Sequence, residues 1–162
     1  MEVDSFADIA EPFNERVSRL VWCTVTTVDR KGRPRSRILH PVWEESTGWI
    51  ATGRSSLKAK HIAENPYVSV TYFDLPADNP LGQKQVFVEC KADWEDDAAE
   101  KRRLWDLIKN APPPVGYDPA LFFQSVENPE FGMLRLNPWR IELSALSDMM
   151  TGQEPQVWRQ KV

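Results

Sequence analysis

The chain has no long apolar run and very few metal-binding residues, and each lack excludes a class of protein. No stretch of about 18 apolar residues occurs, so a membrane-spanning helix is not expected. Only two cysteines and two histidines are present, without C-x-x-C or H-x-x-x-H spacing. This pattern argues against a structural zinc site, and we expect no metal.

Charge and the lack of familiar motifs exclude further classes. The net charge of -4 and the pI near 5.3 argue against a nucleic-acid partner. No Walker loop, G-x-G-x-x-G or G-x-S-x-G motif is present, which disfavours P-loop, Rossmann dinucleotide and α/β-hydrolase sites. Cys23 and Cys90 lie in strand-like runs, so we expect two reduced core thiols. The acidic start, Met1 to Glu15, lacks signal-peptide features, and the expected compartment is the cytoplasm.

The pattern that is present predicts one mainly β (α+β) domain spanning residues 1–162. Hydrophobic residues make up 41% and charged residues 27%, as in ordinary globular proteins. Hairpin-spaced strands with inserted helices favour a small closed or split barrel over a parallel sheet. The expected strands are Val21–Val28, Pro34–Trp43, Gly48–Thr52, Tyr67–Phe73, Gln83–Trp94, and a final pair or one long bent strand over Phe131–Leu136 and Trp139–Leu143. The expected helices are Ser55–Glu64, Glu95–Asn110 and about Asp118–Val126, and Asp74–Gly82 is expected to be a loop.

A strand, turn and helix from Trp49 to Pro66 have the features of an anion site. A helix N-terminus offers unpaired backbone N–H groups and a partial positive charge. Thr52, Ser55 and Ser56 add hydroxyl donors, and Lys58 adds a full charge one turn into the helix. A phosphate monoester would gain several charge-assisted hydrogen bonds there. The alternative is that Ser56 only caps the helix while Lys58 points to water, and spacing alone favours this alternative.

The expected second strand carries a second set of candidate residues. Alternation places Arg35 and Arg37 on one face and Ser36, Ile38 and His40 on the other. A guanidinium on a rigid strand can hold a phosphate or a ring carbonyl in fixed geometry. An ordinary pair of solvent-facing arginines is the alternative, and the local pattern taken alone favours it.

Taken in order, these segments resemble the pyridoxamine 5'-phosphate oxidase-like, FMN-binding split-barrel superfamily. The similarity is greatest to its small bacterial members of the general-stress-protein type and to related deazaflavin-dependent reductases. The residues that carry it are G-R-P-R-S-R-I-L-H at 32–40, W-I-A-T-G-R-S-S-L-K-A-K-H-I-A-E-N-P at 49–66 and K-Q-V-F-V-E at 84–89. With the matching strand order, they cover about residues 15 to 145.

The resemblance implies a six-stranded antiparallel split β-barrel with two or three short helices, and a homodimer with FMN at the subunit interface. The cofactor-binding residues that it assigns to this chain are Arg35, Arg37, Ile38, Leu39, His40, Thr52, Ser56, Lys58 and Gln85. Arg35 to His40 line the ring and ribityl chain, Thr52, Ser56 and Lys58 hold the phosphate, and Gln85 reaches the cofactor from the neighbouring subunit. The implied activity is hydride transfer to or from a small-molecule substrate, and no catalytic residue is assigned.

Departures from the family pattern leave alternatives open. The oxidase has Arg before the lysine where this chain has Leu57, so Lys60 or Arg54 is expected to substitute. The C-terminal R-L-H substrate motif is absent, which counts against pyridoxamine phosphate oxidation. Trp158 either packs against the barrel or folds over the site. The cofactor alternatives are the deazaflavin coenzyme F-420 and haem, with His40 or His61 as ligand, and a non-catalytic carrier is the alternative to an enzyme.

Overall fold

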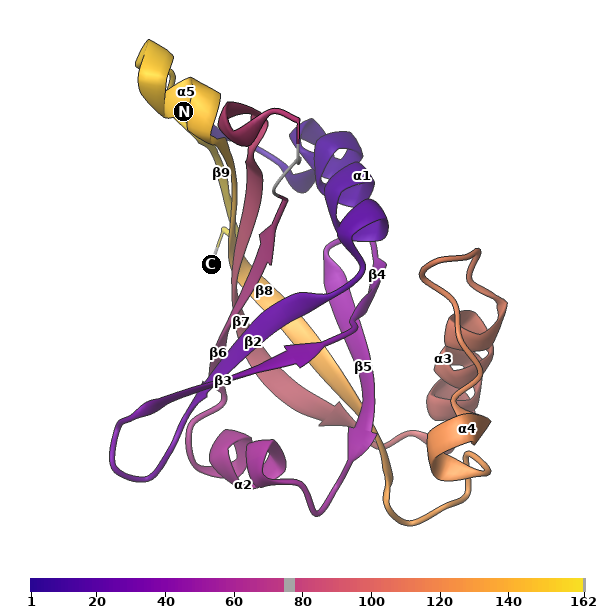
Figure 1. Cartoon of the computed structure of the whole chain (residues 1–162). Helices are drawn as coiled ribbons and strands as arrows, with labels where there is room; N and C mark the ends of the chain where they lie inside the picture. The colour runs from indigo at the N-terminus through magenta and orange to yellow at the C-terminus, as the bar shows by residue number, and fades with distance from the viewer. Residues whose placement is uncertain (75–77, 162) are drawn as a thin grey trace.

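The computed structural model of the chain describes residues 1–74 and 78–161. The described residues form a curved sheet with helices at its ends and at one side (Figure 1). The strands are β1 (Glu2–Val3), β2 (Cys23–Val28), β3 (Pro34–Leu39), β4 (Val42–Glu44), β5 (Thr47–Gly53), β6 (Tyr67–Phe73), β7 (Lys84–Glu95), β8 (Phe131–Ala145) and β9 (Gln156–Arg159). The α-helices are α1 (Ala10–Leu20), α2 (Leu57–Glu64), α3 (Ala98–Asn110), α4 (Ala120–Phe123) and α5 (Leu146–Thr151), and two 3-10 helices span Phe6–Asp8 and Pro80–Gly82.

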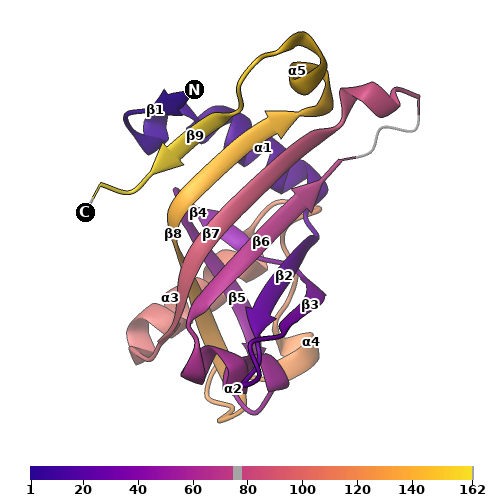
Figure 2. The same cartoon turned by 90° about the vertical axis from the view of Figure 1, so that its left-hand side faces the viewer.

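The sheet curls into a split barrel with one open seam. Its strand order is β1-β9-β8-β7-β6-β2-β3, and β5 extends it from β8, with β4 paired to β5 (Figure 2). The long β8 pairs with β7 on one side, and on the other with β5 along one half and β9 along the other half. Within the described residues β3 pairs only with β2, so the sheet does not close between β3 and β5.

The mainly β class is confirmed, but the expected six strands and two or three helices are wrong. The described residues contain nine strands and five α-helices. The expected strand Pro34–Trp43 divides into β3 and β4 at His40 and Pro41, because proline has no backbone N–H for a ladder. Strands β1 and β9 are short and form a parallel pair between the two ends of the chain. No local sequence pattern predicts this pairing, because its two strands lie at opposite ends of the sequence.

Other predicted elements are confirmed within a few residues. Phe131–Ala145 is one long strand, which confirms that alternative, and its register against β7 shifts between Pro138 and Arg140. Helix α3 begins after Asp97, whose side chain accepts a hydrogen bond from the Glu100 amide. Part of the loop expected at Asp74–Gly82 lies outside the described residues, and Pro80–Gly82 forms a 3-10 helix.

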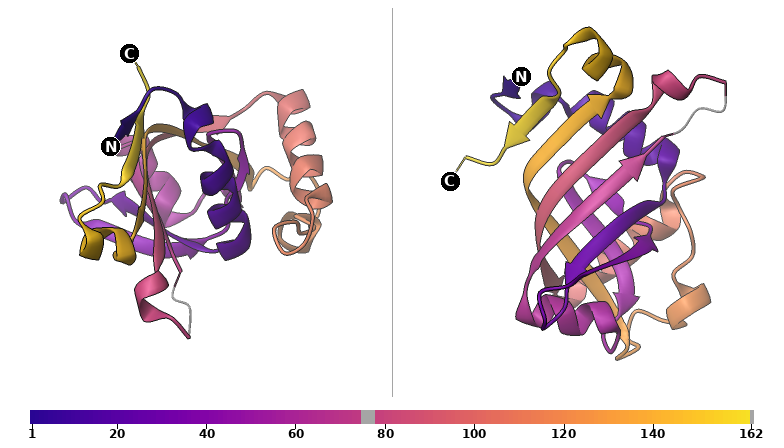
Figure 3. Two further views of the ribbon diagram at one scale, coloured as in Figure 1. Left: turned by 90° about the horizontal axis from the view of Figure 1, so that it is seen from above. Right: turned by 60° about the vertical axis from the view of Figure 1, so that its left-hand side comes forward.

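The barrel interior is filled by alternate residues of the strands and closed at one end by α1. Val68, Val70 and Tyr72 are all buried, as alternation predicts, and so are Val86, Val88 and Cys90. The unpredicted helix α1 adds Phe13 and Val17 to this core. The view along the barrel in Figure 3 shows α1 at the rim of the barrel and α3 and α4 outside the wall. None of the helices in the described ranges is long and apolar enough to cross a membrane.

The C-terminal tryptophan belongs to the barrel packing. Trp158 on β9 packs edge-to-face against Phe6, with ring centroids 5.8 Å apart. It also packs against the main core cluster. The interpretation of Trp158 as a packing residue is therefore confirmed.

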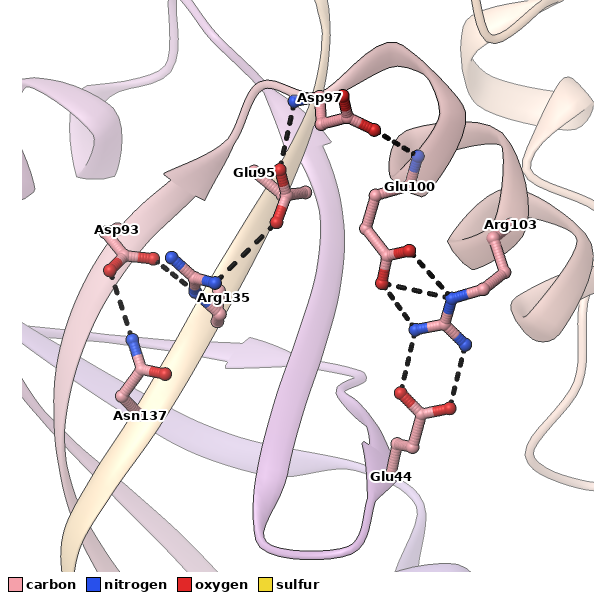
Figure 4. A network of polar contacts seen from close by, with 8 residues as sticks. All are labelled: Glu44, Asp93, Glu95, Asp97, Glu100, Arg103, Arg135 and Asn137. Carbon is pink, nitrogen blue, oxygen red and sulfur yellow. Dashed lines mark hydrogen bonds and ion pairs between the residues drawn. The ribbon is translucent and has the colours of Figure 1, made fainter.

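Helix α3 packs against the outer face of β5 and β8 and is fixed there by ion pairs. Leu104, Trp105 and Ile108 form a second core with Trp49 and Met133, which confirms the predicted apolar stripe of the helix. Arg103 donates two hydrogen bonds to Glu44, over 2.8 and 2.9 Å, and also binds Glu100 one turn earlier (Figure 4). A second group in the same view joins Arg135 to Asp93 and Glu95. The apolar packing and the contacts of Arg103 hold α3 in place, and the segment that follows it lies beside the open seam.

Candidate functional site

A cleft of about 490 Å³ lies at the open seam of the barrel. One wall comes from the end of β3 (Ile38, Leu39 and His40), and the facing wall from residues 50–53 of β5. The third wall comes from Tyr117, which lies between α3 and α4, and from Phe122 and Phe123 of α4. A cleft of this size, mostly apolar with a few polar groups, is typical of a small-molecule site.

Arg37 and Lys58 form a pair of neighbouring cations next to this cleft. Arg37 directly precedes Ile38 on β3, and Lys58 lies in the first turn of α2, which follows β5. Both side chains are half-buried. Burial lowers the pKa of Lys58, and the positive charge of Arg37 lowers it further. Burial also lowers the pKa of Arg37, with a further contribution from Arg35. Two of the predicted residues, on different elements, are therefore near enough for the charge of one to act on the other.

Among the described residues, no carboxylate forms an ion pair with Arg37 or Lys58. The hydrogen bond that holds Arg37 runs from its Nη1 to Thr27 Oγ1, over 2.9 Å. Two like charges in a partly dry environment are unfavourable unless an anion neutralises them. The arrangement can therefore bind an anion such as a phosphate group.

The polar residues at the start of α2 have mixed roles. Ser56 is the N-cap of the helix, and its Oγ accepts a hydrogen bond from the Ala59 amide. This is the simpler of its two predicted roles, but Lys58 does not point freely to water. Thr52 is buried and lines the cleft. Ser55 donates its hydroxyl to the carboxylate of Glu130, so it is not free for a ligand.

The expected substitutes for the missing arginine differ in their surroundings. Arg54 pairs with Asp96 and stacks over the Trp94 ring at 4.5 Å, so other groups already hold its guanidinium. Lys60 is exposed on α2. Arg35 is exposed on β3, on the same face as Arg37, as the register with Thr27 and Val25 shows.

His40 lies between two aromatic rings in the wall of the cleft. Its ring centroid is 5.1 Å from that of Trp22 and 5.0 Å from that of Tyr117. Burial lowers the pKa of His40, and a backbone hydrogen bond with Val115 opposes this effect. Its Nε2 atom is buried and has no hydrogen-bond partner in the described part of the chain. The ring is therefore neutral at pH 7 and offers one uncommitted nitrogen.

Sequence reasoning missed the aromatic wall of the cleft. Trp22, Tyr117 and Phe122 all line it, and Trp22 and Phe122 are 60% and 69% exposed. The signal available in the sequence was the run G-Y-D-P-A-L-F-F after three prolines, which places five apolar or aromatic side chains in a segment too short to bury them all.

Gln85 is not brought to this cleft within one chain. It lies on β7 and lines a different hollow, together with Ser144 of β8 and Asp148 of α5. Ser144 donates its hydroxyl to Gln85 Oε1 over 3.4 Å, and Arg16 donates to the Gln85 carbonyl over 2.9 Å. Gln85 can join the other predicted residues only from another copy of the chain.

The chain was compared with families and with solved structures. The model of the pyridoxamine 5'-phosphate oxidase family matches residues 9–145. The comparison with curated proteins gives no match. General stress protein 26 from Bacillus anthracis is 21% identical, with 91% of this chain and 98% of that chain covered and a TM-score of 0.63.

Two further solved structures carry other descriptions. A NimC/NimA family protein from Clostridium acetobutylicum is 12% identical, covers 96% of this chain and 94% of its own, and has a TM-score of 0.71. A heme binding protein from Mycobacterium smegmatis is 16% identical, covers 88% of this chain and 55% of its own, and has a TM-score of 0.64. At these identities the structures show a shared fold, whereas the family match covers most of the sequence. By its sequence match over residues 9–145 and its split-barrel fold, the chain belongs to the pyridoxamine 5'-phosphate oxidase family.

Proposed function

We propose that the chain binds FMN in the cleft between β3 and β5 and acts as a flavin-dependent oxidoreductase on a small molecule. The observation that carries this proposal is the pair of half-buried cations, Arg37 and Lys58, without a carboxylate partner among the described residues. A phosphate dianion between them would neutralise both charges and accept charge-assisted hydrogen bonds.

The residues of the cleft fit the other parts of a flavin. The apolar walls suit a planar ring, and Tyr117 and Trp22 offer aromatic surfaces on either side of His40. Thr52 supplies a hydroxyl to the cleft from β5, close to the end of the strand that leads to α2. The Nε2 of a neutral His40 is free to accept a hydrogen bond from a ring N–H.

The chain's own contribution is binding, orientation and a fixed positive charge. A bound flavin supplies the hydride chemistry, which explains why no catalytic triad is needed. Arg37 keeps its charge at every physiological pH, and it directly precedes the residues of β3 that line the cleft. His40 stays neutral because burial lowers its pKa. Between these two candidates, Arg37 is therefore the group that favours extra negative charge on a reduced cofactor.

We also propose that the working form is a homodimer with two such sites. Ile38 and Trp22, at the rim of the cleft, are 62% and 60% exposed, and a second chain that covers them would bury apolar surface. The same arrangement would bring Gln85 of a second subunit to the cofactor. Light scattering coupled to size-exclusion chromatography tests this directly, with a dimer mass expected and a monomer mass against it.

Haem is the second candidate ligand, and one observation favours it. The buried Nε2 of His40 has no partner in residues 1–74 and 78–161, and a neutral imidazole nitrogen in an apolar cleft is suited to bind iron. The deazaflavin coenzyme F-420 would use the same cations for its phosphate. Since all three ligands absorb visible light differently, one spectrum separates them.

The deciding experiment is the absorption spectrum of the purified protein, as isolated and after incubation with each cofactor followed by desalting. We expect the two-band spectrum of bound FMN. A single main band would indicate a deazaflavin, and a Soret peak would indicate haem. Retention of none of the three would overturn the proposal. If FMN is retained and reduced but passes electrons to no tested acceptor, the chain is a carrier and its assignment as an enzyme is wrong.

A further inference from the structure

A series of two hydrogen bonds joins three side chains, Arg37, Thr27 and His61, and so links the barrel core to the cation pair. Thr27 on β2 has no exposed surface, and His61 on α2 is 6% exposed. Thr27 Oγ1 lies 2.8 Å from His61 Nδ1, and Arg37 Nη1 donates to the same oxygen over 2.9 Å. The preceding residues on the inner face of β2, Cys23 and Val25, are buried and apolar. Without its two partners the hydroxyl would be a buried, unsatisfied polar group.

Counting donors fixes the direction of each bond. A guanidinium can only donate, so Thr27 Oγ1 accepts from Arg37. The hydroxyl has one proton of its own, and within the described residues its other partner is His61 Nδ1. The arrangement that satisfies the hydroxyl therefore has Thr27 donating its proton to Nδ1 of His61. Both hydrogen bonds then run in the same donor-to-acceptor direction, from Arg37 through Thr27 to His61 on the helix.

This series of hydrogen bonds connects the two halves of the anion site. Arg37 comes from β3, an edge strand that pairs only with β2 in the described part of the chain. His61 lies one turn after Lys58 on α2. The same helix therefore carries both the last residue of the hydrogen-bond series and the second cation. We infer that Thr27 and His61 are positioning residues that hold the Arg37 guanidinium beside Lys58, so that both cations meet one phosphate; this rests on the function proposed above.

The contact is needed because the charges alone would separate the two side chains. Arg37 is next to Lys58 and on the same strand face as Arg35, and both neighbours repel it. A long arginine side chain on an edge strand has many conformations in water, and repulsion favours those that point away. The hydrogen bond to Thr27 selects the conformation in which the site is already assembled.

The test replaces Thr27 by valine, which keeps the shape and removes the hydroxyl. We expect Thr27→Val to raise the Kd of FMN about tenfold and Thr27→Ser to stay within about threefold of wild type. Thr26→Val is the matched control, because Thr26 also binds a β3 side chain, Ser36 Oγ at 2.8 Å, but on the opposite face of the strand. A wild-type Kd for Thr27→Val overturns the inference. Equal losses in Thr27→Val and Thr27→Ser also overturn it, since they indicate a general packing defect.

A second readout does not depend on any cofactor. The pKa of Lys58, followed by NMR of labelled lysine side chains, should rise in Thr27→Val because Arg37 is no longer held beside it, and should stay unchanged in Thr27→Ser. An unchanged Lys58 pKa in Thr27→Val overturns the positioning role. If wild-type protein binds no FMN but this pKa shift occurs, the proposed function fails while the positioning role stands.

Discussion

The guanidinium of Arg37 lies close enough to Lys58 for its charge to lower the pKa of the lysine, although one residue is on an edge strand and the other on a helix. Proteins rarely hold two cations together without a purpose, because the repulsion costs stability. Perturbed charges beside a cleft are a frequent mark of binding sites. The five predictions below test this site and the fold that builds it.

Removal of the Lys58 charge should weaken FMN binding without unfolding the protein. Lys58→Ala deletes one charge-assisted phosphate contact of about 1.5–3 kcal/mol, which corresponds to roughly a ten- to 150-fold rise in Kd. Quenching of FMN fluorescence on titration with protein measures this constant. Lys60→Ala makes the same change at an exposed position of the same helix. If both variants bind alike, the phosphate does not lie at Lys58.

The turn that leads into β3 should give the stability a dependence on acid pH. The backbone amides of Arg33 and Lys31 donate to Asp29, and with the Arg33 side chain they lower its pKa from 3.8 to about 2. A carboxyl whose pKa is lower in the folded state stabilises the fold above its ordinary pKa, and this stability disappears as the pH falls through about 2. Asp29→Asn should therefore lower the melting temperature at pH 5 but hardly at pH 2. A difference in melting temperature that does not change with pH would contradict this assignment.

The two thiols should be unreactive in the native protein. Cys23 and Cys90 are free and buried, which confirms the prediction of reduced core thiols. Burial raises the pKa of Cys23 to about 12 and raises that of Cys90 still further above its ordinary value. Since the thiolate is the reactive form, Ellman's reagent should modify neither residue at pH 8, and both in denaturant. Rapid native modification of either thiol would show that the barrel core is accessible.

Helix α1 should contribute a large share of the barrel's stability. Phe13 has no exposed surface and packs edge-to-face on Trp43, with centroids 5.0 Å apart. Phe13→Ala should lower the free energy of unfolding by about 3–5 kcal/mol, measured by urea titration. Phe122→Ala is the same truncation at a largely exposed position and should cost less than about 1 kcal/mol. Similar losses in the two variants would mean that α1 does not seal the core.

The sequence predicts those parts of the fold that depend on local patterns. Alternation along β6 and β7 correctly identifies the buried faces, and the cap at Ser56 identifies the start of α2. Helix α1 was missed although Ile9, Phe13 and Val17 recur every four residues and are all buried. The pairing of β1 with β9 was missed because it joins distant ends of the chain.

The sequence predicts a residue of the candidate site only where that residue and the features that mark it lie in one segment. Arg37 and Lys58 stand out from the strand and helix that carry them, and the charge of Arg37 lowers the pKa of Lys58. Thr27 and His61 did not stand out, because a threonine in a strand and a histidine in a helix are ordinary until the fold joins them. The contact of Tyr117 with His40 likewise depends on how the segment after α3 packs against β5.

The most direct test of the cation pair as a phosphate site compares FMN with riboflavin, which lacks only the phosphate. Dissociation constants for both ligands with wild-type protein, measured by the same fluorescence titration, isolate the phosphate contribution. We predict that FMN binds at least about tenfold more tightly than riboflavin. Equal affinities would show that Arg37 and Lys58 do not hold the phosphate and would contradict the account.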